Sequence, residues 1–182
     1  VVGLAISTRP DAVGPEVVAV LAEFAARTFL WVELGLQSAS DVALAWARRG
    51  HSVADFVAAA SRLRDAGIPV VAHLMLGLPG ETEADRETCA RMLGDLGVWG
   101  VKFHQVQVVC GTDLEREVIA GRVHIPTVEE YAEMLGAMLR QLPRDIVIHR
   151  LSATCHPEHL STADPNGPDI RDRVLRLLSG QE

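Results

Sequence analysis

The sequence predicts an α/β fold in which parallel strands alternate with single helices. Apolar runs of strand length recur through the first 110 residues, and segments with helical spacing of hydrophobic residues separate them. Separation by single helices of about 10–15 residues is typical of repeated βα units with a parallel sheet. An open doubly wound sheet and a TIM-type barrel both satisfy this pattern. No GxGxxG follows the first apolar run, which argues against a dinucleotide-binding doubly wound fold.

Five strands are expected. Most are nearly continuous apolar runs, as is typical of strands covered on both faces. The fourth is more polar, because Lys102, His104, Gln105 and Gln107 lie in it. Strict alternation places the first two of these on one face and the two glutamines on the other. The expected strands cover residues 1–7, 29–36, 68–76, 100–109 and 145–151.

Capping residues and apolar stripes place helices between and after these strands. Ser52 and Thr82 are N-cap candidates, and Gly67 and Gly97 end the two helices that follow them. A capping-box pattern, Thr127 with Glu130, begins a strongly amphipathic segment. The expected helices lie around 17–24, after Ser38 or Ser40, and over 52–67, 82–97, 111–123, 127–142 and 170–180.

The composition is that of an ordinary globular protein, with 48% hydrophobic and 23% charged residues. A formal charge of −7 argues against a broad nucleic-acid-binding surface. No apolar run reaches the roughly 18 residues that a membrane helix needs, and no signal peptide opens the chain, so a cytoplasmic protein is expected. Cys89, Cys110 and Cys155 have no CxxC spacing, which favours reduced thiols over disulfides and predicts no metal site made by this chain.

Six short motifs follow one another along the chain at tight spacing. They are "TRPD" (8–11), "WVELGLQS" (31–38), "RRGH" (48–51), "HLMLGLPGE" (73–81), "KFHQVQVVCGT" (102–112) and "VIHRL" (147–151). Together they resemble the radical SAM superfamily, most of all a YhcC-like bacterial group. The radical SAM half of the Elongator catalytic subunit and oxygen-independent coproporphyrinogen oxidase are more distant relatives. The resemblance covers almost the whole chain.

The resemblance implies a six-stranded partial (β/α) barrel of the TIM type. Residues 1–110 would supply its C-terminal four βα units, and residues 111–182 a helical and strand extension packed on the barrel. It further implies an iron–sulfur enzyme, in which S-adenosylmethionine (SAM) and a [4Fe–4S] cluster generate a 5′-deoxyadenosyl radical. The radical abstracts hydrogen from a substrate, and a reductant such as flavodoxin or ferredoxin supplies the electron.

The sequence departs from this family at the cluster. The CxxxCxxC whose thiolates bind the cluster is absent, and so is the glycine-rich stretch that holds the methionyl amino group. The first residue, Val1, already lies inside an apolar run, and an unpaired strand there would leave an open sheet edge. We therefore expect a fragment of a larger enzyme, inactive alone, whose cluster ligands lie outside this chain.

Five residues are candidates for cofactor binding. The resemblance implies that Gln37, at a strand's carboxyl end, lies beside the methionine moiety or the ribose, and that Arg49 pairs with the SAM carboxylate. It places Ser7 where some relatives carry a cofactor-contacting glutamate, and His73 near the ribose. Gly77 would shape the backbone beside the adenine together with Pro79 and Gly80. A loop glutamine bonded to its own turn, and a solvated cation at a helix end for Arg49 or Arg48, are the structural alternatives.

Other polar residues are weaker candidates. Lys102, His104 and Gln105 are candidate substrate-binding residues, the alternative being polar contact with a covering helix. Arg9 and Asp11 are expected to pair with each other, and His51 to order a helix junction. His149 and Arg150 are a candidate polar cluster near Cys155 and His156. Cys155, His156 and His159 fit no standard metal spacing.

Two other functions compete with the radical enzyme. One is a half barrel without a cluster that binds SAM, another adenosyl ligand or a partner. The other is a TIM-barrel hydrolase or aldolase, which would need paired carboxylates or a Schiff-base lysine at the strand ends. Glu33 lies within its strand and Lys102 is the single lysine, so this second alternative has little support. A tRNA substrate follows only by analogy with Elongator.

Overall fold

The computed structural model describes residues 2–167 and 170–180, and within them five parallel strands form one sheet. The strands are hydrogen-bonded in chain order, β1-β2-β3-β4-β5, so no strand is inserted between earlier neighbours. Their bounds are β1 Gly3–Thr8, β2 Phe29–Gln37, β3 Val70–Leu76, β4 Gly100–Gln105 and β5 Val147–Arg150. The sheet does not close on itself, because β1 and β5 are the two ends of that order.

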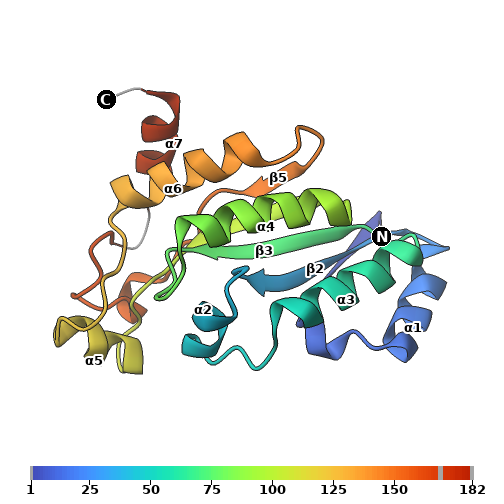
Figure 1. Ribbon diagram of the computed structural model, residues 1–182, viewed down its shortest axis with the longest axis horizontal. Coiled ribbons are helices and arrows are strands. Elements are labelled where there is room, and N and C mark those ends of the chain that lie inside the picture. Colours follow the sequence, from blue (N-terminus) through green and yellow to red (C-terminus); the bar gives the residue numbers. More distant parts are fainter. Residues whose placement is uncertain (1, 168–169, 181–182) are drawn as a thin grey trace.

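Along the chain, helices connect the strands and follow the last of them (Figure 1). They are α1 Pro15–Ala25, α2 Asp41–Trp46, α3 Val53–Asp65, α4 Glu83–Leu96, α5 Asp113–Ile119, α6 Val128–Gln141 and α7 Arg171–Ser179, with short 3₁₀ turns at Pro10–Ala12 and Pro157–His159. Helix α1 contacts α3, α3 contacts α4, and α4 contacts α6. Crossovers between parallel strands are right-handed, so sequential strand order puts these helices on one side as a single layer. This is a segment of a (β/α) barrel and not a doubly wound sheet.

Local capping chemistry determines where most helices begin. Ser52, Thr82 and Thr127 each form a capping box with the residue three positions later. The box at Thr127 was predicted, whereas Ser52 and Thr82 were expected only as the residues at which their helices begin. Gly97 ends α4 in the left-handed conformation, which glycine adopts without a steric penalty. Ser40 precedes α2 without a side-chain cap.

The fourth strand is shorter than predicted. It ends at Gln105 rather than at residue 109, because Val106 and Val108 turn into a small apolar cluster with Leu78 and Ile125. Val109 then makes only an isolated antiparallel bridge to Leu160. The predicted strand was too long because the apolar alternation continues through residues 106–109, which pack outside the sheet.

The two faces of the sheet differ in character. Side chains that face the helix layer form the main core and include Leu34, Leu74 and Phe103. The opposite face, called here the inner face, carries Ser7, Trp31, Glu33, His73, Lys102 and His104, which are joined by hydrogen bonds and ring contacts. β5, from the expected extension, pairs with β4; a domain boundary at residue 110 stays a prediction. No helix in the described part of the chain is long and apolar enough to cross a membrane.

Candidate functional site

Gln37 ends β2 in an unusual backbone conformation. Its φ is 72°, in the left-handed region that residues other than glycine seldom occupy. The pairing of β2 with β3 shifts between Gly35 and Gln37, which is the mark of a β-bulge. Bulges redirect side chains at strand ends, and strained residues of this kind cluster at functional sites.

Arg49 meets Gln37 over Gly35. An ideal Cβ built on Gly35 would lie 2.7 Å from Gln37 Nε2 and 3.2 Å from Arg49 Nη2. Glycine at this position therefore leaves the space that the two side chains occupy. The structure thus brings together two residues predicted to act together, at the carboxyl end of the strand.

Arg49 is an incompletely satisfied cation. Its Nε is buried and has no hydrogen-bond partner among the described residues. Burial lowers the pKa of Arg49, and nearby Arg9 acts in the same direction. Arg9 is itself paired with Asp11 through two hydrogen bonds of 2.9 Å, which confirms that predicted pair. A half-buried guanidinium with an unpartnered nitrogen favours an anionic partner.

The neighbours of Arg49 have structural roles. The Arg48 side chain is 82% exposed and its Nη1 donates to Asp113 Oδ2 at 3.0 Å, so Arg48 is the surface cation of the pair. The His51 ring lies with Nε2 2.8 Å from the Gly35 carbonyl oxygen. His51 therefore connects the segment after α2 to β2, as expected for a residue that orders the junction.

A buried carboxylate joins the loops that follow β2 and β3. Ser38 Oγ donates to Glu81 Oε1 at 2.6 Å, and the Gly77 amide donates to Glu81 Oε2 at 2.9 Å. Burial raises the pKa of Glu81, while the hydrogen bonds from Ser38 and Gly77 oppose that effect. Gly77 has φ 82°, and a Cβ there would lie 2.4 Å from Pro126 Cγ. The hydrogen bonds of Ser38 and Gly77 to Glu81 hold the ends of β2 and β3 together near the Gln37 and Arg49 side chains.

Glu33 is the residue that the sequence analysis missed. It lies on the inner face, its side chain 8% exposed, and it accepts hydrogen bonds from Ser7 Oγ at 2.9 Å, from Trp31 Nε1 at 3.3 Å and from Lys102 Nζ. Burial raises the pKa of this carboxyl, but these donors outweigh it and lower the pKa to about 2. Glu33 is therefore ionised at neutral pH and paired with the single lysine of the chain.

The two histidines of the inner face lie side by side. Their ring centroids are 5.7 Å apart, His73 Nε2 lies 3.2 Å from Glu33 Oε2, and Arg150 Nη2 contacts His104 Nε2. Burial lowers the pKa of both rings, for His104 to about 4 with help from the Arg150 charge. Both are thus neutral at pH 7. Among the described residues, the polar partner of His73 is Glu33, and a contact of His73 with the ribose stays a prediction.

A sequence signal for Glu33 was present. It is a lone acid in the run "FLWVELGL", and in a strand it shares a face with Trp31, Gly35 and, before the bulge, Gln37. A buried ionised carboxylate requires a partner. The partner could not be identified, because Lys102 lies 69 residues away on a strand separated from β2 by β3.

Other predicted residues do not join the site. Gln105 is 3% exposed, and its amide donates to and accepts from the Ala153 backbone at 2.7 and 2.9 Å. It therefore anchors the chain after β5 instead of facing the inner surface. The His156 and His159 rings are 5.7 Å apart, but the described residues contain no group of three His, Cys, Asp or Glu able to hold a metal.

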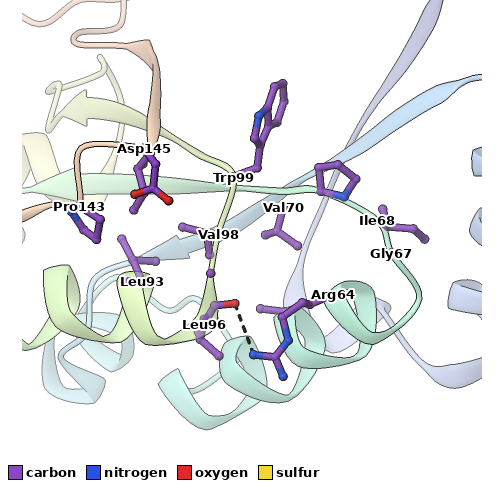
Figure 2. A pocket seen from close by; sticks show the side chains of 15 residues that line it. Arg64, Gly67, Ile68, Val70, Leu93, Leu96, Val98, Trp99, Pro143 and Asp145 are labelled. Atoms are coloured by element: carbon purple, nitrogen blue, oxygen red, sulfur yellow. Dashed lines mark hydrogen bonds between the residues drawn. The ribbon is translucent and has the colours of Figure 1, made fainter.

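A cavity at the opposite end of the strands is a packing feature. Figure 2 shows it between the ends of α3 and α4 and the loop before β5, with Arg64 donating to the Leu96 carbonyl oxygen at 3.5 Å. Its lining includes Gly67, Val98 and Pro143, in loops at the amino ends of the strands. In barrel enzymes this end serves stability and the carboxyl end serves chemistry. The Gln37 and Arg49 site lies at the carboxyl end.

Comparisons with known proteins agree with this architecture. A family profile described as "Radical SAM superfamily" matches residues 1–93, and one described as "Radical_SAM C-terminal domain" matches residues 98–178. The chain is 36% identical to protein YhcC of Escherichia coli K12 over 155 residues, which cover 85% of this chain and 50% of YhcC. The chain thus spans about half the length of the curated relatives YhcC, YtqA and MJ0486 that it matches.

Two further similarities are to a tRNA uridine(34) acetyltransferase and to the solved structure of an archaeal Elp3. The chain is 30% identical to the tRNA uridine(34) acetyltransferase of Methanocaldococcus jannaschii over 153 residues, which cover 82% of this chain and 28% of that protein. Its structure superposes on Elp3 of Methanocaldococcus infernus with a TM-score of 0.84 and 25% identity, covering 99% of this chain and 42% of the Elp3 chain. Elp3 therefore shares the fold of nearly the whole chain.

Proposed function

Because the chain belongs to the radical SAM superfamily, we propose that it supplies the SAM-binding strand ends of a radical SAM enzyme. The observation that carries this proposal is the buried, unpartnered Arg49 Nε beside Gln37, above Gly35. The site would hold the methionyl carboxylate of SAM on Arg49, with Gln37 beside the methionine moiety or the ribose. Ser7, His73 and Gly77 remain proposed cofactor contacts on the neighbouring strands.

The residues present fit SAM but not a cluster. An unpartnered guanidinium suits a carboxylate, and Gly35 leaves room for the Arg49 and Gln37 side chains that would hold the ligand. The family uses SAM with a [4Fe–4S] cluster, yet the described residues contain no set of three metal ligands. In the proposed enzyme, SAM and a cluster bound by residues outside this chain supply a 5′-deoxyadenosyl radical, with an electron from flavodoxin or ferredoxin.

The inner face would then border the substrate. Lys102 holds Glu33 ionised, so neither side chain is free to bind an isolated opposite charge. Neutral His73 and His104 offer ring nitrogens for hydrogen bonds without adding net charge. We assign Lys102 to positioning Glu33, and His104 to substrate contact.

Replacing Gly35 by alanine is expected to weaken SAM binding about tenfold without unfolding the protein. The added methyl group comes too close only to the far ends of the Gln37 and Arg49 side chains, while the Thr8 carbonyl oxygen lies at an ordinary contact distance of 3.8 Å. The two side chains therefore move while the strand stays. Loss of one well-placed charge-assisted hydrogen bond is worth roughly 1.5–3 kcal/mol, and about 1.4 kcal/mol is a factor of ten. Calorimetric titration with SAM measures the affinity.

The control for this variant is Gly136→Ala, which adds a methyl group in α6 at ordinary contact distances of 3.4 Å and beyond. It should bind SAM like the unmodified protein. Equal SAM affinity of Gly35→Ala and Gly136→Ala would show that the space next to Gly35 is not needed for SAM binding.

The proposed function is tested with the full-length protein, reconstituted anaerobically with iron and sulfide. Formation of 5′-deoxyadenosine and methionine from SAM under reduction is the expected result. The 182 residues alone should bind no cluster. SAM binding without cleavage by the full-length protein would instead support an adenosyl-binding half barrel, and no SAM binding would exclude both.

A nucleic-acid substrate is a weaker proposal. Relatives are named as tRNA uridine(34) acetyltransferases, but the chain carries a net charge of −7, which disfavours contact with phosphates over a wide surface. A tRNA substrate would therefore need basic residues outside this chain. A cytoplasmic location stays a prediction.

A further inference from the structure

A cavity borders the free edge of β5, away from the Gln37 and Arg49 site. Its volume is about 570 Å³, within the usual range for small-molecule sites. β5, the residues that follow it and α7 form its walls. The polar side chains that line it belong to His149, Arg150, Ser152, Thr154 and Arg171.

Two buried hydrogen-bond donors in this lining have no acceptor. Arg150 Nε and Ser152 Oγ lack a hydrogen-bond partner among the described residues, and Ser152 is only 7% exposed. His149 Nε2 is also unpartnered, but its ring packs against Trp99 and Gly100. A buried donor without an acceptor costs about 1–3 kcal/mol. Two in one cavity indicate a missing acceptor.

The charge of the lining selects the kind of acceptor. None of the described residues that line the cavity is acidic, although acidic residues outnumber basic ones in the chain as a whole. The described bonding partner of Arg150 is His104, a neutral ring, and not a carboxylate. The Arg150 guanidinium therefore keeps its positive charge uncompensated at the cavity wall. Arginine with a hydroxyl beside it is the usual setting for a phosphate or carboxylate.

We propose that this cavity binds a small molecule through an anionic oxygen group, a phosphate or a carboxylate, held by Arg150 and Ser152. This binding does not depend on SAM. Arg150 also contacts His104 on the inner face, so a molecule held here extends toward the residues that we assign to the substrate. Its identity as the substrate of the radical reaction rests on the proposed function.

The test is thermal unfolding of the full-length protein with inorganic phosphate, and separately with acetate, at constant ionic strength set with potassium chloride. A ligand that binds only the folded state raises the melting temperature in proportion to its occupancy. At least one of the two anions should stabilise the protein beyond chloride, and the more effective one identifies the group. Arg150→Gln should lower that apparent affinity about tenfold or more, the effect of one charged hydrogen bond.

Matched variants keep the test decisive. Ser152→Ala, which retains the charge, should lower the affinity less than Arg150→Gln and serves if the latter does not fold. Arg144→Gln, an exposed change in the loop before β5, should leave the response unchanged. Stabilisation by neither anion beyond chloride, or an equal response of Ser152→Ala, Arg150→Gln and the unmodified protein, would overturn the proposal.

Two arms separate this proposal from the proposed function. Arg49→Ala should lose SAM and keep the anion response, whereas Arg150→Gln should lose the anion response and keep SAM. An anion response in a protein that binds no SAM would refute the function and leave this site standing. SAM binding without an anion response would refute the anion site and leave the proposed function standing.

Discussion

Lys102→Met is expected to destabilise the protein by about 2–4 kcal/mol. The substitution removes the cation from Glu33, whose carboxylate is almost fully buried. Among the described residues, Ser7, Trp31 and His73 would be its remaining polar partners. Breaking a buried ion pair by removing one partner costs about 3–5 kcal/mol. The destabilisation expected here is below that general range because the Lys102 side chain is 20% exposed. Urea unfolding measures the change.

The double variant Glu33→Gln with Lys102→Met should recover most of that loss, because a neutral amide still accepts from Ser7 and Trp31. Arg144→Met, which removes an exposed cation, should change the free energy of unfolding by less than about 0.5 kcal/mol. If Lys102→Met were as stable as Arg144→Met, Glu33 would not depend on its partner. The inner face would then be more hydrated than the structure indicates.

Arg49→Ala is expected to weaken SAM binding by about 30-fold or more. Truncating one member of a buried, hydrogen-bonded charge pair costs about 2–5 kcal/mol, and each 1.4 kcal/mol is about tenfold. The Arg49 side chain lies over Gly35 beside Gln37. Its removal should therefore change the stability of the SAM-free protein little. Calorimetry of the full-length protein gives the dissociation constants.

Arg48→Ala is the matched control, because Arg48 is adjacent in sequence but exposed and paired with Asp113. Exposed ion pairs contribute about 0–1 kcal/mol, so SAM affinity should change by about twofold at most. Arg49→Lys should fall between, since lysine keeps the charge but not the bidentate geometry. An equal loss in Arg48→Ala and Arg49→Ala would indicate a general charge effect and not a carboxylate site.

Features with local causes were predictable from the sequence. Ser52, Thr82 and Thr127 cap helices through residues three positions away, and Arg9 pairs with Asp11 two positions away. The alternation of strands and helices was correct because each apolar run is buried by its own βα unit. The choice between a barrel and a doubly wound sheet required strand order, which periodicity does not contain.

Features that depend on strand register were not predictable from local patterns. Glu33 contacts Lys102 across 69 residues, and Ser38 contacts Glu81 across 43. Gln37 lies near Arg49 where β2 ends in a bulge with positive φ. Gly35 inside the strand is a signal for such a bulge, but it does not give the direction in which the Gln37 side chain points. The candidate pair Gln37 and Arg49 came from the family resemblance, and the space over Gly35 was visible only in three dimensions.

The most direct test of the central claim is a crystal structure of the full-length protein with SAM bound. We expect the methionyl carboxylate to pair with the Arg49 guanidinium at the carboxyl end of β2, with Gln37 in contact with the same ligand. A SAM molecule bound with its carboxylate on Arg150 in the β5 cavity, or elsewhere with Arg49 unengaged, would contradict it.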